Sequence, residues 1–164
     1  MSSRGLPPFE HVVEQYGDDV WRFSASQVGR DRADDVFQET MLAALAAFPS
    51  LRDPHAVRPW LLRIAARKAI DLFRARARAP VLLEKATPDP GSAPAPGLPD
   101  DELWAQVRAL PHKQRQAVAL RFVLDLQYAE IGAAMETSAE AARRNVFEGL
   151  KALRSRMKET DHAD

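Results

Sequence analysis

The sequence predicts an all-α protein built from two small helical domains that a proline-rich linker joins. Apolar side chains recur at three- and four-residue steps over most of the 164 residues, which is the spacing of amphipathic helices. Only seven glycines and a wealth of alanine argue against an all-β fold. Six prolines fall within residues 80–99, and proline removes a backbone donor and clashes inside a helix. We therefore expect domains at 1–79 and 100–164, separated by a semi-extended linker at 80–99.

Two helices are expected before residue 50. The first stretch predicts one helix, or a pair broken near Gly17, and its apolar residues are Phe9, Val12, Val13, Tyr16, Val20 and Phe23. In the second stretch, Asp34 or Asp35 can act as the N-cap, and Pro49 follows the end of the helix. The apolar side of this second helix comprises Val36, Met41, Leu42, Leu45 and Phe48.

A third helix is expected from about Pro59 to Ala77, after a loop that contains two prolines. Its predicted buried face is formed by Trp60, Leu61, Ile64, Ala65 and Leu72. Basic side chains crowd the remainder of its surface, and such a helix can track a phosphate backbone. Trp60 could support an unstacked base, but plain core packing is the simpler interpretation of this side chain.

The C-terminal domain has the pattern of a helix-turn-helix. A helix is expected from about Asp100 through Leu110, another after Pro111, and a third at 126–135. Thr137 to Glu140 then fits a capping box, in which the threonine caps a closing helix that runs to about Met157. A short helix, a three-residue break and a capped, arginine-rich helix are typical of DNA-binding proteins, although many three-helix domains without DNA function look similar.

The closing helix carries candidate DNA-reading residues. Arg143, Arg144 and Phe147 fall off the apolar stripe and lie in the N-terminal half of the helix. In a helix-turn-helix this half enters the major groove, where arginine can bond guanine edges with two hydrogen bonds. The alternative is a solvated amphipathic helix without a ligand.

The net charge of zero hides a strong asymmetry along the chain. Residues 9–57 carry nine acidic and four basic groups, whereas residues 58–79 carry seven basic groups and one acid. Residues 108–158 carry ten basic and five acidic groups. Basic blocks suit phosphates and an acidic block does not, so two kinds of partner are indicated. Charged residues that merely solvate the helices are an equally good reading of the charge alone.

Composition and motif searches argue against an enzyme. The absence of cysteine excludes a disulfide scaffold, a thiolate zinc site and a cysteine nucleophile. No glycine-rich phosphate loop or Ser-His-Asp candidate stands out, and no histidine lies near the acidic segment ADDVFQET to complete a metal site. We therefore expect no metal or other cofactor. The chain also lacks an apolar run of about 20 residues and an N-terminal secretory signal, which indicates a cytoplasmic protein without a membrane span.

Taken together, the motifs resemble a bacterial RNA polymerase sigma factor of the extracytoplasmic-function (ECF) type. YGDDVWRFSASQVGRDRADDVFQETMLAALAAF is similar to the opening helices of that family's first domain, and RPWLLRIAARKAIDLFRARAR to its promoter-melting helix. VRALPHKQRQAVALRFVLDLQYAEIGAAMETSAEAARRNVFEGLKALR is similar to its second domain. Together with the proline-rich linker at 80–99, these stretches cover about 120 residues, and their order and spacing make the resemblance strong.

The resemblance implies a function and a set of partners. A sigma factor binds core RNA polymerase and directs it to promoter DNA, which it helps to melt. The residues that correspond to the contact with the clamp coiled coil of the largest polymerase subunit are Asp35, Val36, Gln38 and Glu39. Those that correspond to recognition of the −10 element are Trp60, Arg63, Arg67 and Lys68, and those for the −35 element are Arg143, Arg144, Asn145 and Phe147. The family often uses an anti-sigma protein as a further partner.

Three positions depart from the family's usual residues. Many members carry asparagine where Arg67 stands, glycine at the turn position of Glu136, and a basic residue at Glu148. Two other functions compete with the sigma-factor interpretation. A dimeric helix-turn-helix regulator would leave the acidic segment and the basic third helix unexplained. A carboxylate-bundle metalloenzyme needs inward-facing Glu-x-x-His pairs, and the sequence has a single one, Glu159 with His162.

Overall fold

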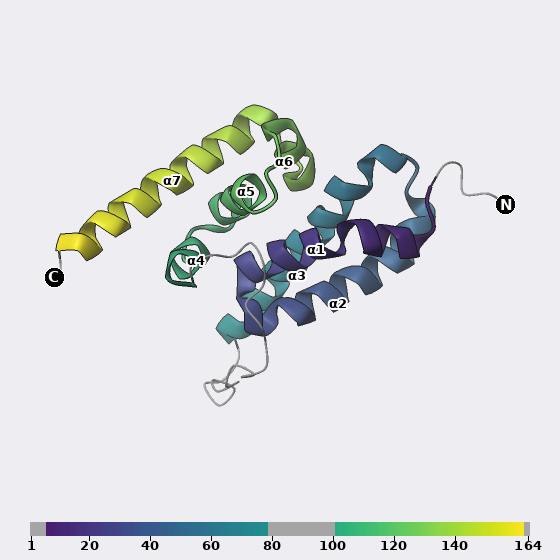
Figure 1. Cartoon of the computed structure of the whole chain (residues 1–164), viewed down its shortest axis with the longest axis horizontal. Helices are drawn as coiled ribbons and strands as arrows, with labels where there is room; N and C mark the ends of the chain where they lie inside the picture. The colour runs from purple at the N-terminus through teal and green to yellow at the C-terminus, as the bar shows by residue number, and fades with distance from the viewer. Residues whose placement is uncertain (1–5, 79–100, 163–164) are drawn as a thin grey trace.

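A computed structural model describes residues 6–78 and 101–162, and within these ranges all regular structure is helical. The predicted linker at 80–99 lies outside the described residues. Figure 1 shows an N-terminal lobe of three long helices beside a C-terminal lobe of four helices. The N-terminal lobe comprises α1 (Phe9–Val28), α2 (Arg30–Ala47) and α3 (Val57–Arg78). The C-terminal lobe comprises α4 (Asp101–Arg108), α5 (His112–Phe122), α6 (Tyr128–Met135) and α7 (Ala139–His162).

A single residue, Gly29, separates α1 from α2. Gly29 has φ +92°, and its N–H donates to the carbonyl of Ala25 at 2.9 Å. Glycine adopts a positive φ without the steric cost that a Cβ brings, so this tight reversal can occur here. The prediction that α2 begins at Asp34 or Asp35 was wrong, because the glycine turn starts the helix at Arg30.

The first helix is continuous, so the break considered near Gly17 does not occur. Gly17 lies in the middle of α1, where it is buried. A Cβ at this position would lie 3.8 Å from the ring of Phe37, which is ordinary van der Waals contact. The glycine therefore sits at the α1–α2 contact without interrupting the helix.

Helix α2 buries small side chains and exposes large ones. Ala33, Thr40 and Ala44 are fully buried, whereas Leu42 and Leu45 are 68% and 54% exposed. The predicted apolar side of α2 was therefore wrong for both leucines. Alanines on the inner face let α2 pack closely against α1 and α3. The leucines face outward, and their hydrophobicity requires an explanation other than the core.

Two short 3₁₀ turns, Phe48–Ser50 and Pro54–Ala56, lead into α3. Helix α3 confirms the predicted third helix, and Leu61, Leu62 and Ala65 form its buried centre. Trp60 is half-buried, and its ring lies 6.3 Å from that of Phe48, measured between centroids. Trp60 therefore packs against the beginning of the segment that connects α2 to α3.

Helices α6 and α7 form the expected helix-turn-helix. Glu136 ends α6 in the left-handed conformation, with φ 58° and ψ 42°, and the Thr137 N–H donates to the Gly132 carbonyl at 2.8 Å. A Cβ on Gly132 would lie only 2.7 Å from the Thr137 carbonyl oxygen, so the tight turn requires glycine at that position. The Ser138 hydroxyl caps α7 by accepting from the Ala141 N–H at 3.1 Å. The predicted capping box was wrong by one residue, because the turn uses Thr137 and moves the cap to Ser138.

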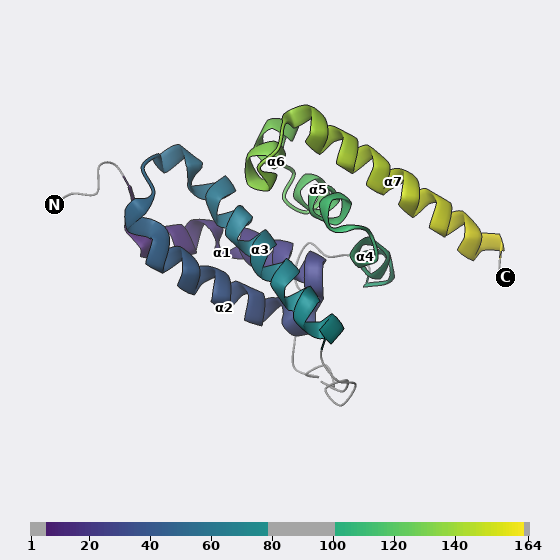
Figure 2. The same ribbon diagram turned by 180° about the vertical axis from the view of Figure 1, so that it is seen from behind.

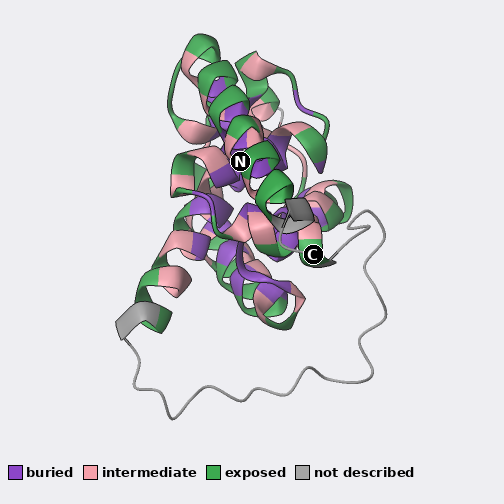
Figure 3. Ribbon diagram, turned by 90° about the vertical axis from the view of Figure 1, so that its left-hand side faces the viewer, coloured by how far each residue is buried: buried purple, intermediate pink, exposed green. Residues whose placement is uncertain are grey.

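The two lobes pack against each other, which adds buried area to helical units this small. Helix α3 contacts α6, and α1 contacts α4 and α5 (Figure 2). Buried segments of both lobes meet in the interior (Figure 3), and one hydrophobic cluster extends through both. The interface also holds a buried polar pair: Arg115 Nε donates to Gln27 Oε1 at 2.9 Å, and Gln27 Nε2 donates to the Arg115 carbonyl at 3.3 Å.

Arg115 is 2% exposed and reaches from α5 to helices α1 and α3 of the opposite lobe. Its guanidinium lies over the ring of Phe73 on α3, 4.2 Å from the ring centroid. Burial lowers the pKa of Arg115 to about 10, so the side chain is charged at neutral pH. A buried charge must be paired or hydrogen-bonded to be tolerated, and here Gln27 and Phe73 provide those contacts.

His112 lies at the contact between the lobes. Its ring meets that of Phe73 edge-on, and its Nδ1 contacts the Arg115 guanidinium. Burial, Arg115 and Arg74 together lower the pKa of His112, so protonation is unfavourable in the docked arrangement. A lowered histidine pKa makes docking complete above the ordinary value of about 6.5 and weaker as the pH falls below it.

Acidification from about pH 7.5 to about 5.5 is therefore expected to loosen the docking of the two lobes. This range spares most carboxylates from protonation. The separation can be followed by energy transfer between dyes on Gln15→Cys and Ser155→Cys, two exposed positions in opposite lobes of a chain without native cysteine. His112→Gln should flatten the pH response; an equal response in that variant would contradict the assignment to His112.

Candidate nucleic-acid interface

The N-terminal half of α7 presents an exposed basic and aromatic surface. Arg143, Arg144 and Phe147 are exposed, Asn145 is half-buried, and the ring-bearing side chain of Phe147 is 66% exposed. On the opposite side of α7, Ala142 and Val146 are buried against the rest of the lobe. The predicted −35 residues thus lie together on a rigid helix, close to its capped end. Phosphates and base edges are the groups that such a surface can bind.

A groove between α2 and α3 gathers the predicted polymerase-binding residues. Its lining is formed by Asp35, Val36, Gln38, Glu39, Leu42, Lys68, Asp71, Leu72 and Ala75. Asp35, Gln38 and Glu39 are exposed at its edge, whereas Val36 is 2% exposed and packs with Val28 and Ala69. The exposed Leu42 adds an apolar contact to this acidic surface. Acidic side chains beside an exposed leucine suit a basic, partly apolar protein partner and repel nucleic acid.

The predicted −10 residues are divided between two faces of α3. Lys68 lies in the acidic groove, beside Asp35 and Asp71. Arg63 and Arg67, four residues apart, lie on the face that meets α6. Trp60 lies near the start of the helix, packed on Phe48. The structure thus brings Arg63 and Arg67 together and separates Lys68 from them.

Arg63 and Arg67 are engaged by the C-terminal lobe. Arg63 Nη2 donates to the Ala133 carbonyl at 2.8 Å, and its Nε lies 3.7 Å from Glu136 Oε1. Arg67 Nη2 donates to both carboxylate oxygens of Glu136 at 3.1 Å. Glu136 stands out in the sequence as an unusual turn residue, but its pairing with α3 was not predicted.

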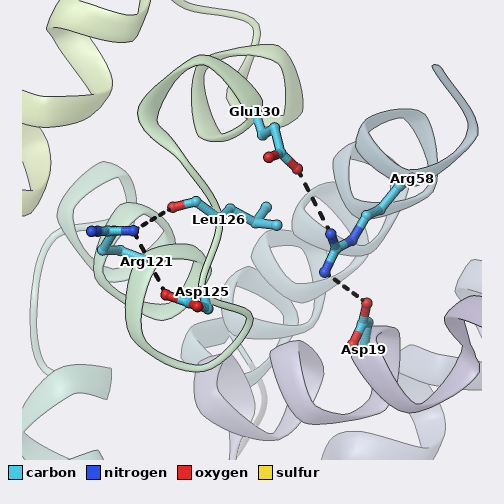
Figure 4. A network of polar contacts seen from close by, with 6 residues as sticks. All are labelled: Asp19, Arg58, Arg121, Asp125, Leu126 and Glu130. Atoms are coloured by element: carbon cyan, nitrogen blue, oxygen red, sulfur yellow. Dashed lines mark hydrogen bonds and ion pairs between the residues drawn. The ribbon is translucent and has the colours of Figure 1, made fainter. Parts of the chain in front are cut away.

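Arg58 is a further basic residue of α3 that the sequence analysis did not select. Figure 4 shows it between the lobes, 3.0 Å from Asp19 Oδ2 on α1 and 3.7 Å from Glu130 Oε2 on α6. In the same view Arg121 contacts Asp125 and the Leu126 carbonyl, all within the C-terminal lobe. Its position in the basic block at 58–79 could have marked Arg58 as a candidate. Its partners could not be predicted, because they depend on how the lobes dock.

No group of three or more His, Cys, Asp or Glu residues in the described ranges could hold a metal ion. Among the helices of those ranges, none is long and apolar enough to cross a membrane.

Family models and relatives agree with the motif assignment. Residues 12–79 match the model of sigma-70 region 2, and residues 100–153 match that of sigma-70 region 4. The chain is 32% identical over 156 residues to the ECF RNA polymerase sigma factor SigC of Mycobacterium tuberculosis, covering 93% of this chain and 83% of SigC. It is 24% identical over 150 residues to RNA polymerase sigma factor SigV of Bacillus subtilis, covering 91% of this chain and 90% of SigV.

Two solved structures share the fold. The sigma factor RpoE, in complex with the anti-sigma factor NepR from Bartonella quintana, superposes with a TM-score of 0.71 at 19% identity and covers 92% of this chain and 96% of RpoE. CnrH, in complex with the cytosolic domain of CnrY, superposes with a TM-score of 0.69 at 23% identity. The match covers 92% of this chain and 88% of CnrH. With both family regions in order, and with a relative above 30% identity matched over most of its length, the chain belongs to the ECF RNA polymerase sigma factors.

Proposed function

We propose that this sigma factor binds core RNA polymerase through the α2–α3 groove and reads promoter DNA through α3 and α7. It directs promoter-specific initiation in the bacterial cytoplasm and performs no catalytic step itself. The observation that carries the proposal is the separation of the charge blocks. The acidic edge of α2 and the basic face of α7 are exposed on different helices, so one chain can hold a protein and DNA at the same time.

The proposed polymerase contact is the clamp coiled coil of the largest subunit. Asp35, Gln38 and Glu39 supply the polar edge, and the exposed Leu42 supplies apolar area beside it. Val36 acts differently from its neighbours, because its buried side chain fixes α2 on α3 and so positions the edge. Lys68 lies in the same groove, and we assign it to the rim of the polymerase contact rather than to the −10 strand.

The proposed −10 contact is made by the loop before α3 and by its arginines. A base flipped from the duplex must recover a few kcal/mol of lost stacking and pairing. Stacking on an aromatic side chain such as Trp60 contributes about 1–3 kcal/mol per base. Arg63 and Arg67 would then follow the backbone of the melted strand. The −35 element is read by Arg143, Arg144, Asn145 and Phe147 on α7.

We also propose that an anti-sigma protein binds this chain, because the two structures of the same fold were solved with NepR and with the cytosolic domain of CnrY. The exposed side chains of Phe122 and Met157, in a groove with Trp104 between α4, α5 and α7, offer an apolar surface to such a partner or to polymerase.

Run-off transcription on genomic fragments with bacterial core polymerase tests the function directly. The chain should direct initiation at discrete promoters and should co-purify with core polymerase. A dimeric regulator would bind DNA without polymerase and would add no new start sites. Transcripts that are identical with and without the chain, from a chain that does not bind core polymerase, would contradict the proposal.

A further inference from the structure

We propose that Glu136 is an intramolecular latch that holds the −10-reading face of α3 against the helix-turn-helix. In the docked arrangement the carboxylate binds the arginines that would otherwise follow the promoter strand. The inference rests on the proposed function of α3 and adds a means of regulating it. The docked chain has to open before Arg63 and Arg67 can reach DNA.

The contacts of Glu136 resemble those of a backbone phosphate. Arg67 reaches both carboxylate oxygens at 3.1 Å, and Arg63 adds a weaker ion pair at 3.7 Å. A carboxylate that receives guanidinium N–H groups uses the same donors that bind a phosphate. Promoter DNA and Glu136 therefore compete for the same arginine donors, and both cannot be bound at once.

The backbone conformation of Glu136 also supports its role as a latch. The residue has φ 58°, a conformation that glycine and asparagine adopt more readily than glutamate. A turn residue without a side chain would form this corner at lower cost. The side chain contributes the carboxylate, whose ion pairs with Arg63 and Arg67 are both made to α3.

Other contacts support the docking without depending on Glu136. Arg22 Nη2 donates to the Val123 carbonyl at 2.6 Å, and the buried pair of Arg115 with Gln27 lies in the same interface. Arg58 joins α3 to Glu130 on α6. The Glu136 side chain is 52% exposed, and ion pairs at such positions are individually weak. Loss of its charge should shift the equilibrium between docked and open chains by about three- to tenfold rather than abolish docking.

The chain contains a matched control for this residue. Asp125 also has a positive φ, 55°, and also forms an ion pair at the edge of the helix-turn-helix. Its partner is Arg121 at 3.7 Å within the same lobe, so Asp125 lies outside the latch. Glu136→Gln and Asp125→Asn each remove one negative charge from a left-handed residue, but only the first touches α3.

The docking equilibrium is measured in the full chain with dyes on Gln15→Cys and Ser155→Cys. Glu136→Gln should lower energy transfer in the direction of the open chain, and Asp125→Asn should leave it at the wild-type value. Glu136→Gly provides a second test, because glycine favours the left-handed turn and the fold should be retained. If both Glu136 variants keep wild-type transfer, or if Asp125→Asn opens the chain equally, the latch is overturned.

The second measurement is affinity for a fluorescent single-stranded 20-nucleotide DNA of random sequence. Release of Arg63 and Arg67 should tighten binding by about three- to tenfold in Glu136→Gln and leave Asp125→Asn unchanged. An open chain that binds DNA no more tightly than the wild type would overturn the competition. Run-off transcription by the wild type separates the two proposals. Its failure contradicts the sigma function. The difference in energy transfer between Glu136→Gln and Asp125→Asn tests the latch independently, because that measurement needs no polymerase.

Discussion

The double charge reversal Asp35→Lys with Glu39→Lys is expected to weaken binding to core RNA polymerase by about tenfold or more. Both carboxylates are exposed at the edge of the α2–α3 groove, and both face outward from a helix whose inner side is packed. The reversal removes two attractive charges and replaces them with two that repel a basic partner, which slows association and speeds dissociation. The measurement is a titration of labelled chain with core polymerase at two salt concentrations.

The matched control is Glu10→Lys with Glu14→Lys. These residues are exposed on α1, have the same four-residue spacing and change the net charge by the same amount. They lie outside the groove, so polymerase affinity should stay within about twofold. Both double variants should bind promoter fragments through α7 as the wild type does. Normal polymerase binding by the groove variant would remove α2 from the interface, and equal losses in both variants would indicate an unspecific charge effect.

The helices themselves were predictable because their signals are local. The apolar spacing that predicts α3 depends only on residues near each other in the sequence. The predicted helix boundaries were wrong where the backbone conformation outweighed the capping propensity of the side chains. Gly29 is the N-cap of α2, five residues before the first predicted cap, Asp34, and the left-handed Glu136 shifts the cap of α7 to Ser138.

The outward face of α2 could not be predicted from the spacing of apolar residues. Leu42 and Leu45 are apolar and helically spaced, so a pattern assigns them to a core, yet they are exposed. Which side of a helix is buried depends on what the neighbouring helices can accommodate, and α1 and α3 accept alanine-sized side chains here. For Leu42, the position beside Asp35 and Glu39 offers an explanation, because its side chain extends a candidate binding surface there.

Docking of the lobes was the feature least accessible from sequence. The contacts of Arg67 with Glu136 and of Arg115 with Gln27 join residues 69 and 88 positions apart, and no local sequence pattern sets the register between them. Charge signs make these pairs possible, but many other pairings of the same charges are equally possible. Arg63 and Lys68 illustrate the consequence. Five residues apart on one basic helix, they point to different faces, and the packing of the neighbouring helices gives those faces different partners.

The second large effect is expected at the −35 element, where alanine substitutions of Arg143 and Arg144 should change DNA binding in different ways. Consecutive residues on a helix point about 100° apart, so the two guanidiniums cannot address one base. We expect Arg144 to contact a base edge and Arg143 a phosphate. Arg144→Ala should then cost about 1–3 kcal/mol on the preferred site and relax preference at one position. Arg143→Ala should weaken binding to all sequences alike and reduce the salt slope by about one.

Salt titrations on a recovered promoter fragment and on mismatched versions of it separate these two roles. Lys151→Ala is the matched control, because Lys151 is exposed on the same helix but two turns further from its capped end. Its loss should leave both the sequence preference and the salt slope near wild-type values. If the roles are exchanged, the base-edge assignment moves to Arg143 and the helix remains the reader. If both arginine variants behave as Lys151→Ala does, α7 does not contact DNA, and its exposed Phe147 would then belong to a protein interface instead.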